Sequence, residues 1–273
     1  MHDPLSSAII DPELLLLAYR SGIFPMADSR DDPEVFWVEP QRRAILPLDH
    51  FRCSRSLART LRRERFRVTC NQAFIDVMAA CAAPRPCADD DSGGESWISR
   101  RIAASYGNLH RLGHAHSIEC WQDDEHGKAR LVGGLYGVGF DRVFCGESMF
   151  SRVTDSSKVA LAWLVASLRR TGCMLLDCQF ITPHLASLGA IEITQARYIA
   201  LLKQAQKCYV AAGRGAAAGL GSGGFDGVGL GAGGTAAPLA LPEGFAALLA
   251  EAAAAGSSSS PGNFIAQSLT QTS

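Results

Sequence analysis

The apolar residues of the first 210 positions follow two spacings, one typical of helices and one typical of strands. Leu57 and Leu61 lie one helical turn apart, which predicts a helix over 55–64. Residues 131–138 and 142–149 alternate, which predicts two antiparallel strands joined by a tight turn. Further helices are predicted from residue 11 and over 71–82, 102–112, 157–170 and 195–206, and further strands at 43–47, 66–69, 115–121, 173–180 and 191–193. Because these elements interleave irregularly, we expect an α+β fold with a mixed sheet between helices.

Breaks in this pattern divide the chain into three expected parts. A helix that starts at Asp11-Pro12 and ends at Gly22, followed by a short strand that ends at Pro47, predicts a small N-terminal domain over 1–47. The main mixed domain is expected over 48–210. Residues 211–273 differ, because they hold 14 of the 27 glycines and only four charged residues.

This C-terminal segment is predicted to be disordered. Pro242, Phe245, Leu248 and Leu249 suggest one short helix, but the remainder has no periodicity. A segment so rich in Gly and Ala buries too little apolar surface to offset its ordering entropy.

The charge balance gives no general attraction to polyanions, because 26 Lys and Arg face 27 Asp and Glu, a net charge of −1. Seven arginines nevertheless lie between positions 52 and 67, and four of them (Arg55, Arg59, Arg62 and Arg63) fall on one predicted helix. Two interpretations stay open: a solvated helix face, or a surface that contacts phosphates.

Several classes of function are excluded by what the sequence lacks. No apolar run of 18 residues predicts a membrane span, and the start lacks the features of a secretory signal. With nine cysteines and no CxxC pair, a reduced compartment, the cytoplasm, is expected. No glycine-rich phosphate loop predicts ATP or a dinucleotide, and His110, His114 and His116 lack further ligands at metal-binding spacing.

Polar residues within apolar strands are the candidates for chemistry. Glu147 lies between apolar neighbours at the end of one strand, and Asp177 and Gln179 lie on another. Strand alternation places Asp177 and Gln179 on one face and Cys178 on the other. A catalytic pair and a buried hydrogen-bond network are equally open interpretations, since either residue is costly to bury alone. A thiol nucleophile is disfavoured, because burial raises the pKa of a cysteine.

Seven strings in order carry a specific resemblance. They are SGIFP (21–25), SRSL (54–57), WI (97–98), LGHAHSIE (112–119), FCGESMFSR (144–152), DCQ (177–179) and ASLGA (186–190). Over about residues 10–207 the chain resembles the bacterial leucyl/phenylalanyl-tRNA–protein transferases. The resemblance implies a small N-terminal domain and a catalytic domain like that of the GNAT acetyltransferases, without acetyl-CoA; the sequence has no acetyltransferase pyrophosphate loop.

The resemblance also implies an activity that needs no cofactor or metal. Members move Leu or Phe, with Met as a further candidate, from aminoacyl-tRNA to the α-amine of proteins that begin with Arg or Lys. The product is degraded through the N-degron pathway. We therefore expect aminoacyl-tRNA and such acceptor proteins as partners, no membrane association, and a monomer. Two other classes stay open: an acyltransferase with another donor, and a tRNA-binding module without catalysis.

Roles for individual residues follow from the same resemblance. Gln179 would accept a hydrogen bond from the attacking amine, Asp177 would polarise and orient the Gln179 amide, and Glu147 would hold the cationic side chain of the acceptor. Trp97 would stack on the terminal adenosine. The donor pocket would be formed by Leu135, Phe144, Met149, Leu161, Leu164 and Leu168, although core packing is a competing interpretation for the leucines of 157–170. The arginine helix then becomes a candidate surface for acceptor-stem phosphates.

The chain also departs from the family pattern. Met26 stands where many members have an aromatic residue, and the loop at 88–95 is longer and more acidic than usual. Residues 211–273 have no counterpart in the resemblance.

Overall fold

The computed structural model describes residues 9–83, 96–215, 238–255 and 260–270. Its helices are α1 (Pro12–Arg20), α2 (Arg55–Arg62), α3 (Phe74–Cys81), α4 (Arg100–Arg111), α5 (Ser156–Arg170), α6 (Pro183–Ser187), α7 (Gln195–Gly215), α8 (Leu241–Ala254) and α9 (Pro261–Thr270), with a 3-10 turn η1 (Leu48–His50). Its strands are β1 (Phe24–Met26), β2 (Phe36–Val38), β3 (Arg42–Ile45), β4 (Arg67–Cys70), β5 (Ala115–Asp123), β6 (Ala129–Phe140), β7 (Val143–Ser151), β8 (Leu175–Gln179) and β9 (Ile191–Thr194).

Seven of these strands form one mixed sheet in the order β4-β5-β6-β7-β8-β3-β9. Every neighbouring pair is antiparallel except β7 and β8, which run parallel. The parallel pair is short, because β7 pairs with β8 only along Val143, Phe144 and Cys145. Beyond Cys145, β7 continues to Ser151 paired with β6 alone, after a register shift at Tyr136 and Gly137. The two central strands therefore separate, and the sheet opens between them.

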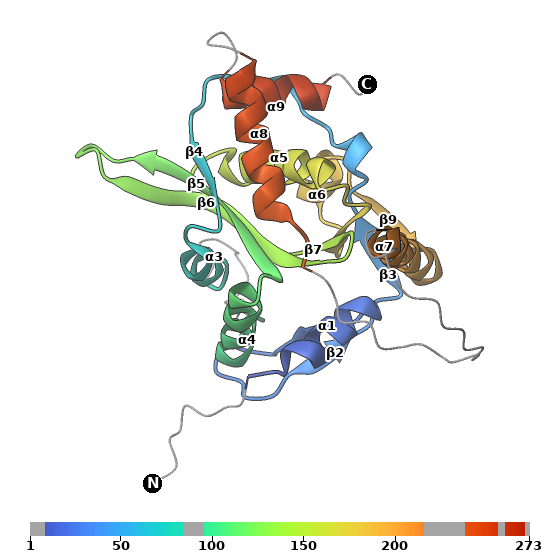
Figure 1. The fold of residues 1–273 in the computed structure, drawn as a ribbon. Helices are drawn as coiled ribbons and strands as arrows, with labels where there is room; N and C mark the ends of the chain where they lie inside the picture. Colours follow the sequence, from blue (N-terminus) through green and yellow to red (C-terminus); the bar gives the residue numbers. More distant parts are fainter. Residues whose placement is uncertain (1–8, 84–95, 216–237, 256–259, 271–273) are drawn as a thin grey trace.

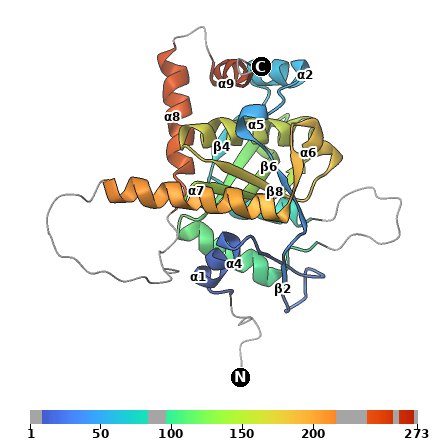
Figure 2. The same ribbon diagram turned by 90° about the vertical axis from the view of Figure 1, so that its right-hand side faces the viewer.

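Helices cover both faces of the sheet, as Figures 1 and 2 show. One buried apolar cluster packs α2, α5, α8 and α9 against the sheet, and a second packs α1, α3, α4 and α7. The expected α+β fold with a mixed sheet is confirmed.

The N-terminal part is small and begins where the sequence predicts. The carboxylate of Asp11 accepts hydrogen bonds from the backbone N–H groups of Glu13 (2.9 Å) and Leu14 (3.1 Å), which caps α1. Strands β1 and β2 form a separate two-stranded sheet. The strand expected before Pro47 is β3, which lies within the seven-stranded sheet between β8 and β9. The domain boundary at residue 47 therefore stays a prediction.

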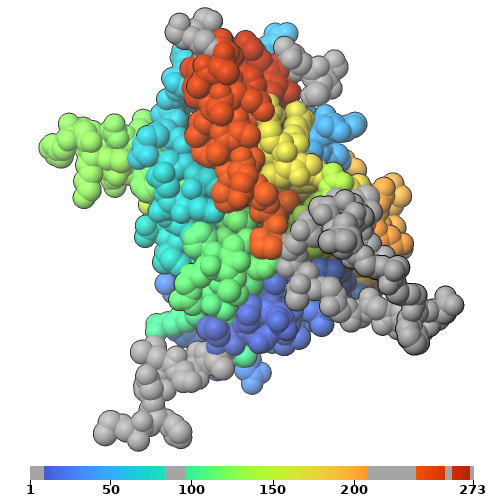
Figure 3. Space-filling view, in the orientation of Figure 1, coloured from blue at the N-terminus to red at the C-terminus, as the bar shows by residue number. Residues whose placement is uncertain are grey.

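The prediction that residues 211–273 are disordered is wrong for three stretches, the first of which, 211–215, is the end of α7. Residues 241–254 and 261–270 form α8 and α9, which pack on the main core. In Figure 3 their red and dark orange atoms lie over the upper part of the surface that faces the viewer. Leu241, Phe245, Leu248 and Ala252 recur along α8 at helical spacing and are all buried. The short helix suggested from Pro242 is therefore present as α8, whereas α9 was not predicted. Residues 216–237, part of the same prediction, lie outside the described residues.

Two other predictions concern the loop at 88–95 and the absence of a membrane-spanning segment. The acidic loop at 88–95 lies outside the described residues. Within those residues, none of the helices has the length and hydropathy needed to cross a bilayer.

Candidate active site

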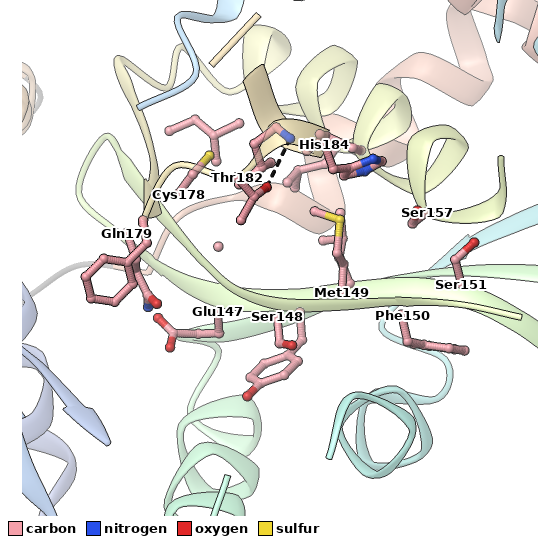
Figure 4. A pocket seen from close by; sticks show the side chains of 18 of the residues that line it. Glu147, Ser148, Met149, Phe150, Ser151, Ser157, Cys178, Gln179, Thr182 and His184 are labelled. Carbon is pink, nitrogen blue, oxygen red and sulfur yellow. Dashed lines mark hydrogen bonds between the residues drawn. The ribbon is translucent and has the colours of Figure 1, made fainter. Parts of the chain in front are cut away.

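A cavity of about 500 Å³ opens where β7 and β8 separate. Its lining is mainly apolar and comes from β6, β7, α5, the end of β8 and the α6 region. The lining residues are Trp97, Leu135, Tyr136, Gly146, Glu147, Ser148, Met149, Phe150, Ser151, Ser157, Leu161, Leu164, Leu176, Cys178, Gln179, Phe180, Thr182, His184 and Leu185. At one end Glu147 and Gln179 project toward each other, and Met149 lies farther along between β7 and His184 (Figure 4). The site therefore combines an apolar chamber with a polar end.

Glu147 is the acidic group of this polar end. Its side chain is buried, and its Oε2 accepts a hydrogen bond from the hydroxyl of Tyr106 at 3.1 Å. The Tyr106 hydroxyl also lies 2.5 Å from that of Tyr19. Oε1 has no hydrogen-bond partner within the described part of the chain. Burial raises the pKa of Glu147 to about 7, so the carboxyl group is poised to bind a donor or a cation.

Asp177 lies behind the cavity in a closed hydrogen-bond network. Nε of Arg43 donates to its two oxygens at 2.9 and 3.1 Å, and Nη2 donates to Oδ2. The hydroxyl of Tyr198 donates to Oδ2 at 3.0 Å, and the backbone N–H of Gln179 donates to Oδ1 at 2.8 Å. The side chains of Arg43 and Asp177 are 1% and 0% exposed, so this is a fully buried ion pair. Burial lowers the pKa of Arg43, but the charge and the hydrogen bonds of the adjacent Asp177 carboxylate together raise it by more. The pKa therefore lies above its ordinary value, and the guanidinium stays charged.

Gln179 has a left-handed backbone, with a φ of 60°. This conformation interrupts the alternation of β8, so Cys178 and Gln179 both line the cavity whereas Asp177 does not. The prediction that Asp177 and Gln179 share a face opposite Cys178 is therefore wrong. A left-handed backbone is uncommon outside glycine, and the bond from the Gln179 N–H to Asp177 stabilises it here.

The predicted relay between Asp177 and the Gln179 amide also differs from the geometry. Asp177 meets Gln179 through the main chain, and its oxygens are occupied by Arg43 and Tyr198. The side-chain Nε2 of Gln179 is buried without a hydrogen-bond partner in the described residues. Asp177 is thus placed to fix the backbone from which Gln179 reaches into the cavity.

The structure brings together most of the predicted pocket. Trp97, Leu135, Met149, Leu161 and Leu164 line the cavity, together with Glu147 and Gln179. Phe144 and Leu168, also predicted as pocket residues, are not among the lining residues and are fully buried in the apolar core.

Cys178 lines the cavity, which the sequence did not predict. Burial raises the pKa of its thiol, so it is poorly suited to be a nucleophile, as expected.

Sequence reasoning missed the residues that support the polar end. Arg43 carries the clearest signal, because a buried Asp177 requires a cation and Arg43 is the buried arginine of β3, whereas Arg42 is exposed. Tyr19 lies on α1 and Tyr106 on α4, and nothing in the sequence around either tyrosine indicates that the two meet at the site.

The predicted arginine helix is α2, and it borders a second cavity, also of about 500 Å³. Cys53, Arg55, Ala58, Arg59, Arg62, Arg63 and Thr270 line this cavity. Helix α2 buries Leu57, Ala58 and Leu61 on its inner side. In the part of the chain that the structure describes, neither the three arginines of α2 nor Arg63 at its C-terminal cap takes part in an ion pair. Their charge is therefore available to an external anion.

Comparison with known proteins adds independent information. Residues 45–203 match the family model of the leucyl/phenylalanyl-tRNA protein transferases, and residues 9–41 match the model of the N-terminal domain of the same family. A protein named leucyl/phenylalanyl-tRNA–protein transferase from Novosphingobium aromaticivorans is 66% identical over 268 residues, which is 97% of each chain. The match includes most of residues 211–273, so the expectation that this segment has no counterpart in the family is wrong. Proteins of the same name from Rhizorhabdus wittichii and Zymomonas mobilis are 59% and 57% identical, over 77% and 74% of this chain and 80% and 71% of theirs. A solved structure described as that of L-PGS from Bacillus licheniformis covers 63% of this chain and 54% of that chain at 12% identity, with a TM-score of 0.30 that does not establish a shared fold.

Proposed function

The chain belongs to the leucyl/phenylalanyl-tRNA–protein transferase family, and from this membership we propose that it transfers Leu or Phe from aminoacyl-tRNA to the N-terminal α-amine of acceptor proteins. The acceptors begin with Arg or Lys, and the product is marked for degradation through the N-degron pathway in the cytoplasm. The observation that carries the proposal is the apolar cavity with one carboxyl and one amide side chain at its polar end.

The apolar chamber suits the side chain of the donor amino acid. Leu135, Leu161 and Leu164 provide fixed walls, and Met149 provides a flexible one. Because a thioether chain adapts its shape, one chamber can admit both a branched aliphatic and an aromatic side chain. Trp97 lies on the lining, where its ring can stack on the terminal adenosine.

The reaction itself needs positioning more than activation. The neutral α-amine attacks the ester carbonyl carbon, a C–N bond forms, the bond to the ribose oxygen breaks, and the amine proton leaves as the ribose regains a hydroxyl. An α-amine has a pKa of about 8, so a useful fraction is neutral near pH 7. Gln179 holds the amine by accepting its hydrogen bond, and Asp177 with Arg43 fixes the Gln179 backbone.

Glu147 selects the acceptor. The Glu147 side chain projects toward Gln179 at the cavity end, and its Oε1 has no hydrogen-bond partner among the described residues. An Arg or Lys side chain can therefore donate to Glu147 while the adjacent α-amine meets Gln179. The arginines of α2 and of its C-terminal cap (Arg55, Arg59, Arg62 and Arg63) contact backbone phosphates of the tRNA.

A transfer assay tests the proposal. Leu-, Phe- and Met-charged tRNA are each combined with otherwise identical acceptor proteins that begin with Arg, Lys or Met. We expect transfer of Leu and Phe to the Arg and Lys acceptors. Tight tRNA binding without any transfer would instead identify a binding module.

Three single variants assign the chemistry in the same assay. Asp177→Ala and Gln179→Ala should each lower turnover by about 10², whereas Cys178→Ala should retain most of it. Loss of activity in Cys178→Ala alone would contradict the assignment and restore a thiol mechanism.

A further inference from the structure

The C-terminal helices α8 and α9 lie outside the residues matched by the family models, which end at residue 203. They are nevertheless integrated into the core. The rings of Trp163 on α5 and Phe245 on α8 lie 5.1 Å apart, and Gly244 allows α8 to approach α5 so closely that a Cβ there would lie 2.7 Å from the carbonyl oxygen of Ser167. Helix α8 therefore covers the side of α5 that faces away from the active-site cavity.

Helix α9 packs against both α5 and α2, and Figure 2 shows α9 and α2 side by side. Arg169 on α5 donates to the carbonyl of Ser268 in α9 at 3.1 Å and to the carbonyl of Leu48 in η1 at 3.2 Å. At the other end of α9, the backbone N–H of Gly262 donates to Glu64, just beyond α2, at 3.1 Å. The contact is close, because a Cβ at Gly262 would lie 2.1 Å from the carbonyl oxygen of Leu61.

Helix α2 needs such support. It has only eight residues, and isolated helices of this length are unstable in water. Arg59 lies three and four positions before Arg62 and Arg63, so like charges face each other along the helix and destabilise it further. Helix α9 contains no charged residue, so it packs on α2 without neutralising the arginines.

Resting on the proposed function, we infer that α8 and α9 position the arginine helix α2 relative to the pocket helix α5. In this arrangement the 3′ end of a tRNA enters the apolar chamber while its acceptor-stem phosphates meet α2. Gly262 and Glu64 are positioning residues in this arrangement, since neither lines either cavity. Thr270 of α9 completes the wall of the arginine cavity.

Two donors separate this role from a general structural one. Phe-charged tRNA uses both cavities, whereas phenylalanyl-adenosine has no acceptor stem and uses only the apolar chamber. In the full chain, Gly262→Ala should push α9 away from α2. We expect the KM for Phe-tRNA to rise about tenfold, while transfer from phenylalanyl-adenosine stays unchanged. The exposed α9 variant Gln267→Ala is the matched control and should behave like the unaltered chain with both donors.

A second pair of variants isolates the Glu64 contact. Glu64→Ala and Glu64→Gln both remove a negative charge near the arginines, but only Gln keeps an oxygen that can accept from the Gly262 N–H. We expect the KM for Phe-tRNA to be higher for Ala than for Gln, with no difference for phenylalanyl-adenosine. This pair decides the question if Gly262→Ala does not fold.

The outcomes are distinct. Equal losses with both donors, or no change in the KM for Phe-tRNA in any variant, would overturn the positioning role. Absence of transfer from either donor by the unaltered chain would instead overturn the proposed function.

Discussion

The two cavities have similar volumes and opposite chemistry. The first is an apolar chamber with one carboxyl group, built on strands and supported by a buried ion pair. The second is lined by three arginines of a two-turn helix and a fourth at its C-terminal cap, and this helix is supported by an uncharged helix from the C-terminal part of the chain. Burial makes the first cavity selective and insensitive to salt, whereas exposed charge makes the second attractive to polyanions and sensitive to salt. Recognition by shape and recognition by charge therefore take place in two different cavities.

The largest expected effect comes from the support of the first cavity. Arg43→Ala leaves Asp177 buried without its cation, so the free energy of unfolding should fall by about 3–5 kcal/mol, measured by denaturant titration. Arg42→Ala is a matched control one residue away, because Arg42 pairs with Glu192 at an exposed position. Its cost should stay below about 1 kcal/mol. Similar costs for both variants would contradict the structural role of the buried pair.

The next effect concerns acceptor recognition in the first cavity. Glu147→Gln keeps the shape but removes the charge, so kcat/KM for an Arg-starting acceptor should fall by about 10². The pKa of Glu147 is about 7, so the ionised fraction rises between pH 6 and pH 8. The KM for the acceptor should therefore fall as the pH rises across this range. A Gln variant with the same pH dependence of KM would assign the titration to another group.

The second cavity is tested by removing its charge. Replacing Arg59, Arg62 and Arg63 with Ala should weaken tRNA binding by about 30-fold and flatten its dependence on salt. Binding is measured by fluorescence anisotropy over a range of salt concentrations. A triple variant at exposed basic residues elsewhere, Arg111, Lys128 and Arg130, provides the control. An equal loss of affinity in the control would restore the interpretation of α2 as a solvated face.

The smallest effect sharpens selectivity within the apolar chamber. Met149→Phe should lower the use of Phe relative to Leu by about tenfold or less, because a rigid ring replaces an adaptable chain on the lining. The ratio of kcat/KM for the two charged tRNAs measures it. Met174→Phe, at an exposed methionine, should leave the ratio unchanged.

Local patterns predicted most elements but not how distant ones meet. The helix expected at 157–170 is observed at Ser156–Arg170, because its signal lies in adjacent residues. The placement of β3 between β8 and β9 depends on contacts more than a hundred residues apart and left no local trace. Within 241–270 the spacing of Phe245 and Leu248 suggested one short helix, but α9 was missed because its ten residues were averaged with the rest of the Gly- and Ala-rich segment.

The candidate site shows the same division. Glu147 and Gln179 were identified from their strings, and both line the cavity. The error about Asp177 has a physical reason: strand alternation assumes a regular backbone, and the left-handed Gln179 breaks it. The bond from the Gln179 N–H to Asp177 spans only two residues. The carboxylate of Asp177 is held in place for it by Arg43, which is 134 residues away in the sequence, and no local pattern predicts that contact.

The position of β3 also has a consequence for synthesis of the chain. Arg43 and Asp177 are separated by 134 residues. At about 5–20 residues per second, the ribosome needs about 7 to 27 s to make the partner after Arg43 is made. Strands β8 and β9, which flank β3, are both made after this delay. A strand made early therefore waits while about half of the chain is made before it joins the sheet, and this part of the fold can form only after β9 has been made.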